Sequence, residues 1–527
     1  MSTGKIELSV GVVKYVDPNE IITEEEYNYI KNKVPELDGR VGIIEDEIEE
    51  INTSLEHNMN KKIIVNVSQF GAKGDGITND TQAINDAINY VSTRGGQVVF
   101  DNKEYRVSKI LVKSNVEIVG NNATLKQIDG VTSLDHILAF SAGVQNIKVS
   151  NINIDGNRVI NKNIYIAGIN FLTCSNITLE NINVKNVSGD GIFFGYVGQL
   201  ANNIKMKNVK VENSSRNEIV FSNCKNIVCD NFTIISNDAF SSTFEFEKHD
   251  TTEILENIHL NNFTVTTGIE PVKLLTNAKY GDMKNIKLSN ITLTGEKSYI
   301  SCMDFNNIEF ENINAKHIEF TDCNNLIITK CKLNKLLVSQ LNYTSKNVLI
   351  SKNTLNDSNN FGLSLSKVED VSVSENIIKD NTTSGVLISY ECKNVKVNDN
   401  IITNNDYAVE FVSNTHDNII IENNVTTGNK TGDFKNITVT KSLINNNTST
   451  KHKYTFISPN GVGYHSLEYD NNYALTFGAF FHAKRLALTD KYNNGYDVIP
   501  NGSIYEDKTD GKLKYKNLSG EIHTLSN

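Results

Sequence analysis

Alternating apolar and polar residues recur along most of the chain, in short segments that begin with Asn or Asp followed by an aliphatic residue. Examples are NIKVSNINI, NITLENINV and NIIIENNVT. Alternation with a period of two predicts β-strands that each have one apolar face. Thirteen such segments start 18–31 residues apart, at Asn146, Asn176, Asn203, Asn226, Asn257, Asn285, Asn307, Asn325, Asn347, Asp370, Asn394, Asn418 and Asn436.

A repeat of this length cannot enclose a core by itself, but stacked repeats bury a continuous interior. The pattern therefore predicts an all-β parallel solenoid. The recurrent Asn is expected at a bend, where its side chain stacks on the next Asn. Leucine-rich repeats have a similar period, but this chain lacks their Leu-rich consensus and their helical half. Four cysteines occupy one phase, two residues before a repeat Asn, which indicates a buried interior position: Cys174, Cys224, Cys323 and Cys392.

The two ends of the chain have different patterns. Seven apolar residues form a strict heptad seam at Val34, Leu37, Val41, Ile44, Ile48, Ile51 and Leu55. This seam predicts a coiled coil over residues 34–60, and its β-branched d positions favour a homotrimer; an amphipathic helix packed on its own chain is the alternative. Residues 1–33 show no clear pattern. The repeats stop near Asn447, and residues 451–527 are expected to form a small C-terminal β module that serves trimerisation or receptor binding.

Composition narrows the range of functions. The chain has 527 residues and a net charge of −11, which argues against binding nucleic acid through its phosphates. No run of 18 apolar residues predicts a membrane-inserted helix, and residues 1–20 show no standard secretion signal. Seven cysteines without CxxC or Cys/His spacing predict neither a disulfide framework nor a structural zinc site.

Residues 63–100 predict a strand, a glycine-rich turn at Gly71–Gly76, a helix and a second strand. The turn lacks the order of a phosphate-binding loop and is expected to be structural. The segments VNVSQFGAKGDGITNDTQAINDAINYV (65–91) and GGQVVF (95–100) resemble the opening of the pectate-lyase-like right-handed β-helix superfamily. The family's usual Pro and Gly before the following Tyr are replaced by residues 101–104. This resemblance implies a right-handed parallel β-helix over residues 61–450.

The combination of coiled coil, β-helix and C-terminal module resembles a bacteriophage tailspike or tail appendage. That resemblance implies a homotrimer in the virion, attached to other tail or baseplate proteins through residues 1–33 and acting at the host cell surface. It also implies a depolymerase for a bacterial surface polysaccharide such as capsule or exopolysaccharide, or for wall teichoic acid.

Acid–base chemistry is expected on an outward face of the solenoid. Aligning the repeats places Glu245 and Glu247 on the same face of one strand, with Glu218 on the adjacent coil and Asp190 one coil further. Neighbouring carboxylates shift one another's pKa, so that one can act as acid and another as base or nucleophile. These four are the expected catalytic residues. The expected substrate-binding residues are Arg216, Lys248, Lys273, Phe193 and Tyr196.

Other interpretations remain open at this point. Outward Glu and Lys residues commonly only keep a solenoid soluble, and the site could lie elsewhere or between subunits. The protein could also be a receptor-binding adhesin without turnover, or a structural fibre. Asp155 fits a turn position, and the isolated His249 fits a surface loop. No cofactor is required, although carboxylates could hold a divalent cation if the bond cleaved is a phosphodiester.

Overall fold

The computed structural model describes residues 4–7, 13–16, 63–132, 135–162, 164–236, 243–267, 272–275, 283–295, 298–413, 415–437, 442–445, 447–448, 452–457, 464–469, 475–477, 491–492, 503–507, 512–516 and 521–524. The chain divides into two compact units: unit 1 comprises residues 1–298 and 306–309, and unit 2 comprises residues 299–305 and 310–527. The predicted coiled coil at 34–60 lies outside the described residues. Within residues 1–33 only the antiparallel strands β1 (Gly4–Glu7) and β2 (Val13–Val16) are described.

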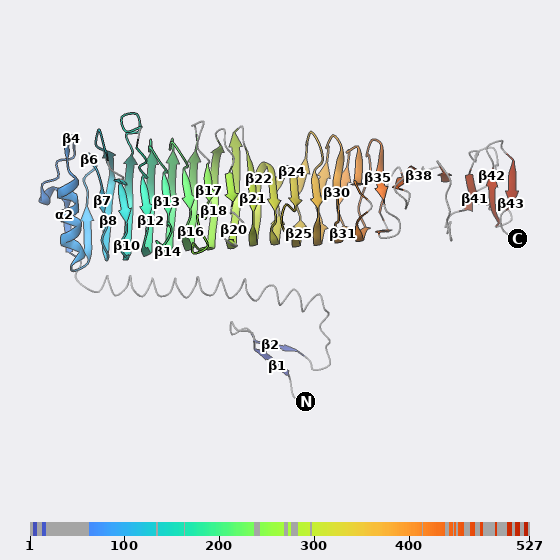
Figure 1. Ribbon diagram of the computed structural model, residues 1–527, viewed down its shortest axis with the longest axis horizontal. Helices are drawn as coiled ribbons and strands as arrows, with labels where there is room; N and C mark the ends of the chain where they lie inside the picture. Colours follow the sequence, from blue (N-terminus) through green and yellow to red (C-terminus); the bar gives the residue numbers. More distant parts are fainter. Residues whose placement is uncertain are drawn as a thin grey trace. The chain divides into compact units, whose positions relative to one another are not determined.

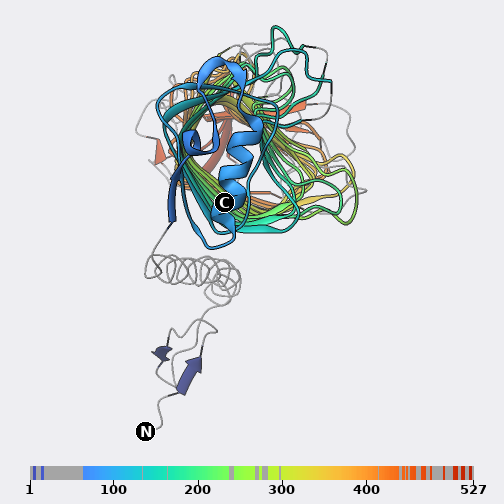
Figure 2. The same cartoon turned by 90° about the vertical axis from the view of Figure 1, so that its left-hand side faces the viewer.

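Unit 1 opens with the predicted strand–turn–helix–strand segment. Its elements are β3 (Ile63–Asn66), the 3-10 helix η1 (Val67–Phe70), β4 (Asp75–Asn79), α2 (Thr81–Ser92), β5 (Gly96–Val99), β6 (Glu104–Val107) and β7 (Ile110–Leu111). The α2 helix buries Ile84, Ile88 and Val91 and lies across the end of the coils (Figure 2). The carboxylate of Asp80, which is 1% exposed, accepts hydrogen bonds from the backbone N–H groups of residues 73 and 74 at 2.7 and 2.9 Å. The glycine-rich turn is therefore structural, as predicted.

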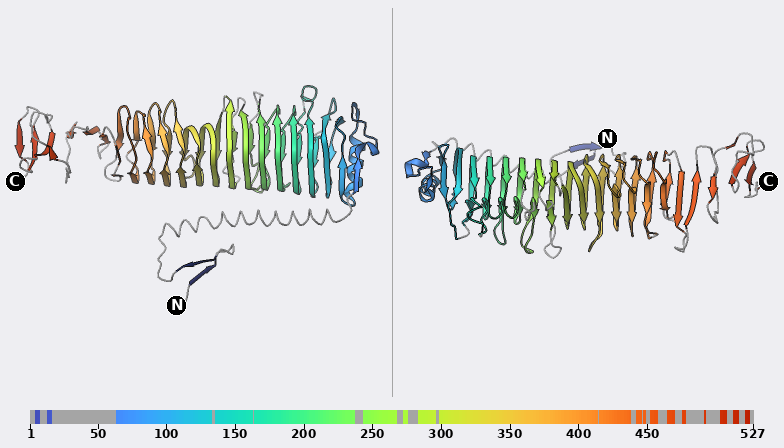
Figure 3. Two further views of the ribbon diagram at one scale, coloured as in Figure 1. Left: turned by 180° about the vertical axis from the view of Figure 1, so that it is seen from behind. Right: turned by 90° about the horizontal axis from the view of Figure 1, so that it is seen from above.

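Successive coils in the rest of unit 1 pair in parallel (Figures 1 and 3). Each coil combines a long strand with a short one. The long strands are β8 (Val116–Gln127), β10 (Val144–Asp155), β12 (Cys174–Lys185), β14 (Ala201–Glu212), β16 (Cys224–Ile235), β18 (Leu255–Thr267) and β20 (Met283–Gly295). The short strands are β9 (Leu138–Phe140), β11 (Ile169–Phe171), β13 (Ile192–Phe194), β15 (Ile219–Phe221), β17 (Phe244–Phe246) and β19 (Val272–Leu275).

The repeat asparagines produce the bends, as predicted. In β12, Asn176 and Asn181 have φ values of 55° and 56°, the left-handed conformation that Asn tolerates better than most residues. The Nδ2 of Asn176 donates to Oδ1 of Asn146 at 3.2 Å, and the Nδ2 of Asn203 donates to Oδ1 of Asn176 at 2.8 Å. Each side chain thus links two coils, so the pattern that identified the repeats also fixes their stacking.

The interior of unit 1 contains a column of stacked phenylalanine rings. Neighbouring centroids lie 4.7–4.9 Å apart along Phe140, Phe171, Phe194, Phe221 and Phe246. Offset aromatic stacking adds to the free energy that burial of these side chains supplies. The predicted interior position of the cysteines is also confirmed, because all seven in the chain are buried free thiols.

Unit 2 also has strands in parallel register, and apart from β22, whose residues 306–309 belong to unit 1, they are shorter than the long strands of unit 1. They are β21 (Tyr299–Met303), β22 (Phe305–Thr321), β23 (Asn324–Thr329), β24 (Lys332–Ser339), β25 (Ser345–Ser351), β26 (Thr354–Asn356), β27 (Leu363–Ser366), β28 (Val368–Ser374), β29 (Ile377–Lys379), β30 (Ser384–Ser389), β31 (Lys393–Asn398), β32 (Ile401–Thr403), β33 (Tyr407–Phe411), β34 (Asp417–Glu422), β35 (Gly432–Ile437) and β36 (Ser442–Asn445). The predicted parallel β-solenoid is therefore observed in each unit.

Strand pairing changes after residue 450. Strand β37 pairs with β38 and β38 with β39 in antiparallel fashion, as do β41 with β42 and β42 with β43. The bounds are β37 (His452–Ile457), β38 (Tyr464–Tyr469), β39 (Leu475–Phe477), β40 (Lys491–Tyr492), β41 (Ser503–Asp507), β42 (Lys512–Lys516) and β43 (Ile522–Thr524). A separate C-terminal module stays a prediction. No helix among the described residues has the length and apolar character that crossing a membrane requires.

Candidate functional site

The short strands of unit 1 carry the residues that the sequence singled out. Their register agrees with the alignment of the repeats: Val220 pairs with Phe193 and Glu245, and Glu245 pairs with Lys273. The expected exposure of Phe193 is wrong, since Phe193 is 8% exposed and its partner Val220 is fully buried. Both pack in an apolar cluster with Ala167 and Leu172. Phe193 is therefore covered by protein and has little surface left for a substrate.

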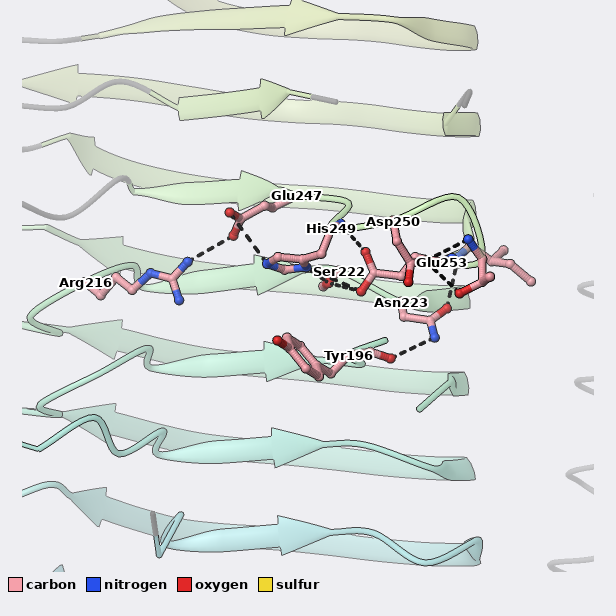
Figure 4. A network of polar contacts seen from close by, with 10 residues as sticks. Tyr196, Arg216, Ser222, Asn223, Glu247, His249, Asp250 and Glu253 are labelled. Atoms are coloured by element: carbon pink, nitrogen blue, oxygen red, sulfur yellow. Dashed lines mark hydrogen bonds and ion pairs between the residues drawn. The ribbon is translucent and has the colours of Figure 1, made fainter. Parts of the chain in front are cut away.

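Glu247 follows strand β17 and lies between the guanidinium of Arg216 and the imidazole of His249 (Figure 4). Its Oε2 accepts a hydrogen bond from Nη2 of Arg216 at 3.0 Å, and its Oε1 lies 3.7 Å from Nε2 of His249. The backbone N–H of Glu247 donates to the carbonyl of Phe221 on the preceding coil at 2.8 Å, which fixes the start of the side chain. With 32% of its side chain exposed, the carboxylate can reach a ligand from solvent.

A buried carboxylate orients the ring of His249. Nδ1 of His249 lies 3.3 Å from Oε1 of Glu253, and the backbone N–H of His249 donates to Oε2 of the same residue. Ser222 Oγ donates to Oε1 of Glu253 at 3.0 Å and lies 3.0 Å from Nδ1. The hydrogen bond with Glu253 raises the pKa of His249. Burial would raise the pKa of Glu253, but its hydrogen bonds with the side chain and backbone of His249 and with Ser222 together outweigh burial and lower it. Nδ1 is committed to these partners, so Nε2 is the nitrogen that faces Glu247.

Ser222, His249 and Glu253 do not form a nucleophilic triad. In such a triad the hydroxyl and the carboxylate contact different ring nitrogens, whereas here both contact Nδ1. Ser222 is also completely buried. Ser222 and Glu253 instead hold the imidazole of His249 in one orientation.

An exposed tyrosine stands next to this ring. The ring of Tyr196 lies 5.4 Å from that of His249 between centroids, and Tyr196 is 49% exposed. Asn223 fixes the Tyr196 turn, because its Nδ2 donates to the Tyr196 carbonyl at 2.9 Å while its Oδ1 accepts from the backbone N–H of Ile254 at 2.9 Å. Gly195 permits this close approach: a Cβ there would lie 1.8 Å from the carbonyl oxygen of Asn223. Tyr196, which the sequence predicts to bind substrate, is thus an exposed aromatic residue beside His249.

Asp190 lies behind Arg216 and is completely buried, so the prediction that it is an exposed site residue is wrong. Its carboxylate accepts hydrogen bonds from the hydroxyl of Tyr165, from Nη1 of Arg216 at 3.5 Å and from the backbone N–H of Asn217 at 3.0 Å. Burial raises the pKa of Asp190 although these partners favour its ionised form. The guanidinium of Arg216 therefore bridges a buried carboxylate and the exposed Glu247.

Glu218 is likewise completely buried, and the predicted exposure of this residue is wrong. Its carboxylate turns back to accept hydrogen bonds from the backbone N–H and the hydroxyl of Ser214, at 3.2 and 2.6 Å. Burial raises the pKa of Glu218 to about 7. It closes the turn that carries Arg216 and has no surface to offer a substrate.

Three predicted site residues remain: Glu245, Lys248 and Lys273. Glu245 is half-buried in β17, two residues from Glu247, and its charge acts on Arg216. Lys248 is only 8% exposed, so its expected surface position is wrong. Lys273 pairs with Glu245 through its backbone, and its side chain lies outside the described residues.

Sequence reasoning assigned His249 to a surface loop and did not single out Ser222 or Glu253. The i,i+4 spacing of His249 and Glu253 was the available signal, although such a spacing is common in loops without chemical meaning. Ser222 comes from the previous coil, and only the three-dimensional register brings it beside the other two. Within the described residues, no group of three or more His, Cys, Asp or Glu side chains is arranged to hold a metal ion.

Residues 272–426 match the family model described as "Right handed beta helix region". Among curated proteins, mannuronan C5-epimerase AlgE2 of Azotobacter vinelandii is 34% identical over 149 residues, which cover 24% of this chain and 15% of that protein. Alginate lyase 7 of the same organism is 35% identical over 145 residues, covering 23% of this chain and 17% of that protein. The match thus spans less than a fifth of each relative's length.

The solved structures found by structural comparison have low sequence identity to this chain. The tailspike protein of Escherichia coli bacteriophage HK620, in complex with a pentasaccharide, gives a TM-score of 0.49 at 11% identity, covering 90% of this chain and 93% of that one. The surface adhesin PfbA of Streptococcus pneumoniae gives a TM-score of 0.39 at 16% identity, covering 79% of this chain and 99% of that one.

Proposed function

We propose that this protein cleaves a glycopolymer by acid–base chemistry at the site formed by Arg216, Glu247, His249 and Tyr196. One observation carries the proposal: a partly exposed carboxylate and an imidazole of fixed orientation lie 3.7 Å apart next to an exposed aromatic ring. Cleavage of a glycosidic bond needs one group that gives a proton and another that takes one, both within reach of the same bond.

His249 supplies the acid in this proposal. Its raised pKa keeps the ring protonated closer to neutral pH, and Glu253 holds Nδ1 so that Nε2 donates the proton to the leaving oxygen. Glu247 acts as the base. It takes a proton from water in hydrolysis or from a sugar carbon in elimination. Glu245, whose Cα lies about 6.6 Å from that of Glu247 along the chain, provides a second carboxylate near the site.

The other residues bind substrate or position these groups. Tyr196 offers an apolar face on which a sugar ring can stack. Arg216 donates hydrogen bonds, and Asp190 holds its guanidinium in place from behind. In this proposal Glu218 is a positioning residue rather than a catalytic one, and Phe193 is a packing residue rather than a substrate-binding one.

Two kinds of evidence support a glycopolymer as the ligand. The curated relatives named above are an epimerase of mannuronan and a lyase of alginate. The sequence pattern of heptads followed by β-helix repeats resembles phage tail proteins. We therefore propose a homotrimeric phage tail protein that acts on a host surface polymer: capsule, exopolysaccharide or wall teichoic acid. The proposed chemistry needs no cofactor, and a divalent cation would enter only if the polymer is a teichoic acid.

The proposal is tested by incubating the intact chain with purified capsules, exopolysaccharides and wall teichoic acids and following polymer length with time. An unsaturated sugar at the new end indicates elimination, a reducing end without it indicates hydrolysis, and a released phosphomonoester indicates phosphodiester cleavage. Glu247→Gln should stop the shortening and leave polymer binding within a factor of a few. Asp86→Asn, on the exposed face of α2, is the matched control and should change neither.

Binding without shortening would show a receptor-binding adhesin instead of an enzyme. Full turnover in both Glu247→Gln and His249→Gln would refute this site. Sedimentation of the intact chain tests the trimer, and a monomer would contradict it.

A further inference from the structure

One corner of the coils in unit 2 exposes apolar side chains. Leu341, Tyr343, Tyr390 and Val412 are 66, 60, 53 and 42% exposed. All four follow the end of a strand in the same stack, namely β24, β30 or β33. We name these four residues the aromatic corner.

Strand register stacks the turns that carry the four residues. Val338 pairs with Leu365, Leu365 with Ile388, and Ile388 with Phe411, so the turns that follow these residues stack on one another. The turns that carry Tyr343 and Tyr390 lie two coils apart, which is roughly 10 Å at the usual spacing of strands. The four residues are therefore distributed along the stack of coils and not around one coil.

A buried carboxylate fixes the first turn of the aromatic corner. Asp322 is 3% exposed, and it accepts hydrogen bonds from three consecutive backbone N–H groups: Leu341 at 2.7 Å, Asn342 at 2.8 Å and Tyr343 at 3.1 Å. Charge-assisted bonds of this kind are stronger than those between neutral groups. Leu341 and Tyr343 are thus held in solvent by a rigid backbone, so a ligand would lose little conformational freedom on binding them.

Tyr390 is held in an unfavourable conformation. Its φ is 48° and that of Glu391 is 41°, two consecutive left-handed residues, neither of which is glycine, asparagine or aspartate. The carbonyl of Tyr390 accepts from the backbone N–H of Lys367 at 3.0 Å, and the backbone N–H of Glu391 donates to Oγ1 of Thr415 at 3.0 Å. Strain of this kind is retained where neighbouring bonds enforce it, and it concentrates at ligand-binding positions.

We propose that the aromatic corner is a second binding site for sugar rings of the glycopolymer. Tyrosine suits such a ligand because its face is apolar while its hydroxyl stays in water. Asn342, Lys367 and Glu391 belong to the same stacked turns and offer partners for sugar hydroxyls. The choice of ligand rests on the proposed function, whereas the site itself rests on exposure, register and backbone geometry.

The shape of the corner favours a linear polymer over a protein. A stable protein interface buries about 800 Å² on each partner around a contiguous apolar centre. Four side chains distributed over the turns that follow β24, β30 and β33 do not provide such a centre. A polysaccharide chain needs only successive rings at intervals along one line.

Affinity is measured in the Glu247→Gln background, which removes turnover, by migration of the intact chain in gels that contain the polymer. The probe is the capsule, exopolysaccharide or teichoic acid that the wild-type chain shortens fastest, or the one it binds most tightly if none is shortened. Tyr343→Ala with Tyr390→Ala should weaken binding on the order of tenfold. Tyr343→Phe with Tyr390→Phe should restore it. Tyr90→Ala, a tyrosine 48% exposed in α2, is the matched control and should bind normally.

The outcomes separate the two proposals. Unchanged affinity in the double alanine variant overturns the aromatic corner, even where Glu247-dependent shortening upholds the enzyme. A loss of affinity with no polymer shortened supports the corner and refutes turnover. If the wild-type chain binds none of the polymers, both proposals fail. Circular dichroism on every variant separates lost binding from lost folding.

Discussion

Glu253 is completely buried and accepts hydrogen bonds from both the backbone N–H and the ring of His249, four residues earlier. The side chain of Glu253 thereby fixes the position of His249 and the rotation of its imidazole. Because the pKa of His249 is raised mainly by this contact, Glu253 acts on the proposed chemistry without touching substrate. It is a positioning residue, and its effect should be visible in the dependence of activity on pH.

Replacing Glu253 by Gln keeps the size of the side chain and removes its charge. The pKa of His249 should fall, so the imidazolium should be lost at a lower pH than in the wild-type chain. The descending alkaline limb of kcat against pH should shift to lower pH. Polymer shortening at a series of pH values measures the shift, and an unchanged profile would show that His249 is not the acid.

The same pair makes a prediction about stability. Because the pKa of His249 is raised in the folded chain, its contribution to the free energy of unfolding is complete below the unfolded pKa of 6.5. That contribution is lost as pH rises through the folded pKa. Because the pKa of Glu253 is lowered in the folded chain, its contribution to the free energy of unfolding is complete above the unfolded pKa of 4.5. That contribution is lost as pH falls through the folded pKa. The stability difference between wild type and Glu253→Gln should therefore be largest at about pH 5.5 and smaller at about pH 8.5. Urea unfolding at the two pH values measures it, and a difference that grows towards alkaline pH would contradict the pairing.

Asp190 should matter for stability as well as for activity. Asp190→Ala leaves the Tyr165 hydroxyl and the Asn217 N–H without their buried acceptor, which should cost roughly 1–3 kcal/mol for each group that water cannot reach. Arg216 would also lose the partner that holds it, so kcat/KM should fall. Denaturant unfolding and polymer shortening measure the two effects. Asp86→Ala on the exposed helix face should stay within about 0.5 kcal/mol of wild type.

The solenoid could be predicted from the sequence because each repeat carries a local pattern. A period of two and an Asn at each bend are visible in one dimension, and the stacking of Asn176 on Asn146 follows from them. The sequence also predicted Glu247 and Arg216 near one another, because the alignment of repeats gives the correct register along the short strands.

The position of turn residues did not follow from the same alignment. Glu218 directly precedes a strand, yet its side chain folds back onto Ser214, a choice that depends on one local hydrogen-bond network. The outward face at Phe193 was expected to be exposed, but it is covered by an apolar cluster whose members come from different coils. Alternation along a strand identifies two faces and does not say whether other parts of the chain cover the outer one.

The cysteines should be unreactive in the folded chain. Burial raises the pKa of Cys174 to about 12 and that of Cys392 to about 11, so few thiolates exist near neutral pH. A polar thiol reagent should label none of the seven residues in native protein and all seven in urea, as read by mass spectrometry. Rapid labelling of any cysteine in the native chain would contradict the buried interior position of that residue.

At Asn181 the two contributions of the asparagine ladder, the row of asparagines hydrogen-bonded from coil to coil, can be measured separately: the side-chain hydrogen bonds and the left-handed backbone. Its Nδ2 donates to Oδ1 of Asn151 at 2.8 Å, its Oδ1 accepts from Nδ2 of Asn208 at 2.9 Å, and its φ is 56°. Asn181→Gly removes the two bonds but tolerates the left-handed backbone, whereas Asn181→Ala also adds a conformational cost of roughly 1–2 kcal/mol. Both variants should unfold at lower denaturant concentration than wild type, and the alanine variant at the lower of the two. If the alanine variant is as stable as the glycine variant, the bend does not constrain the choice of residue, and the ladder acts through its hydrogen bonds alone.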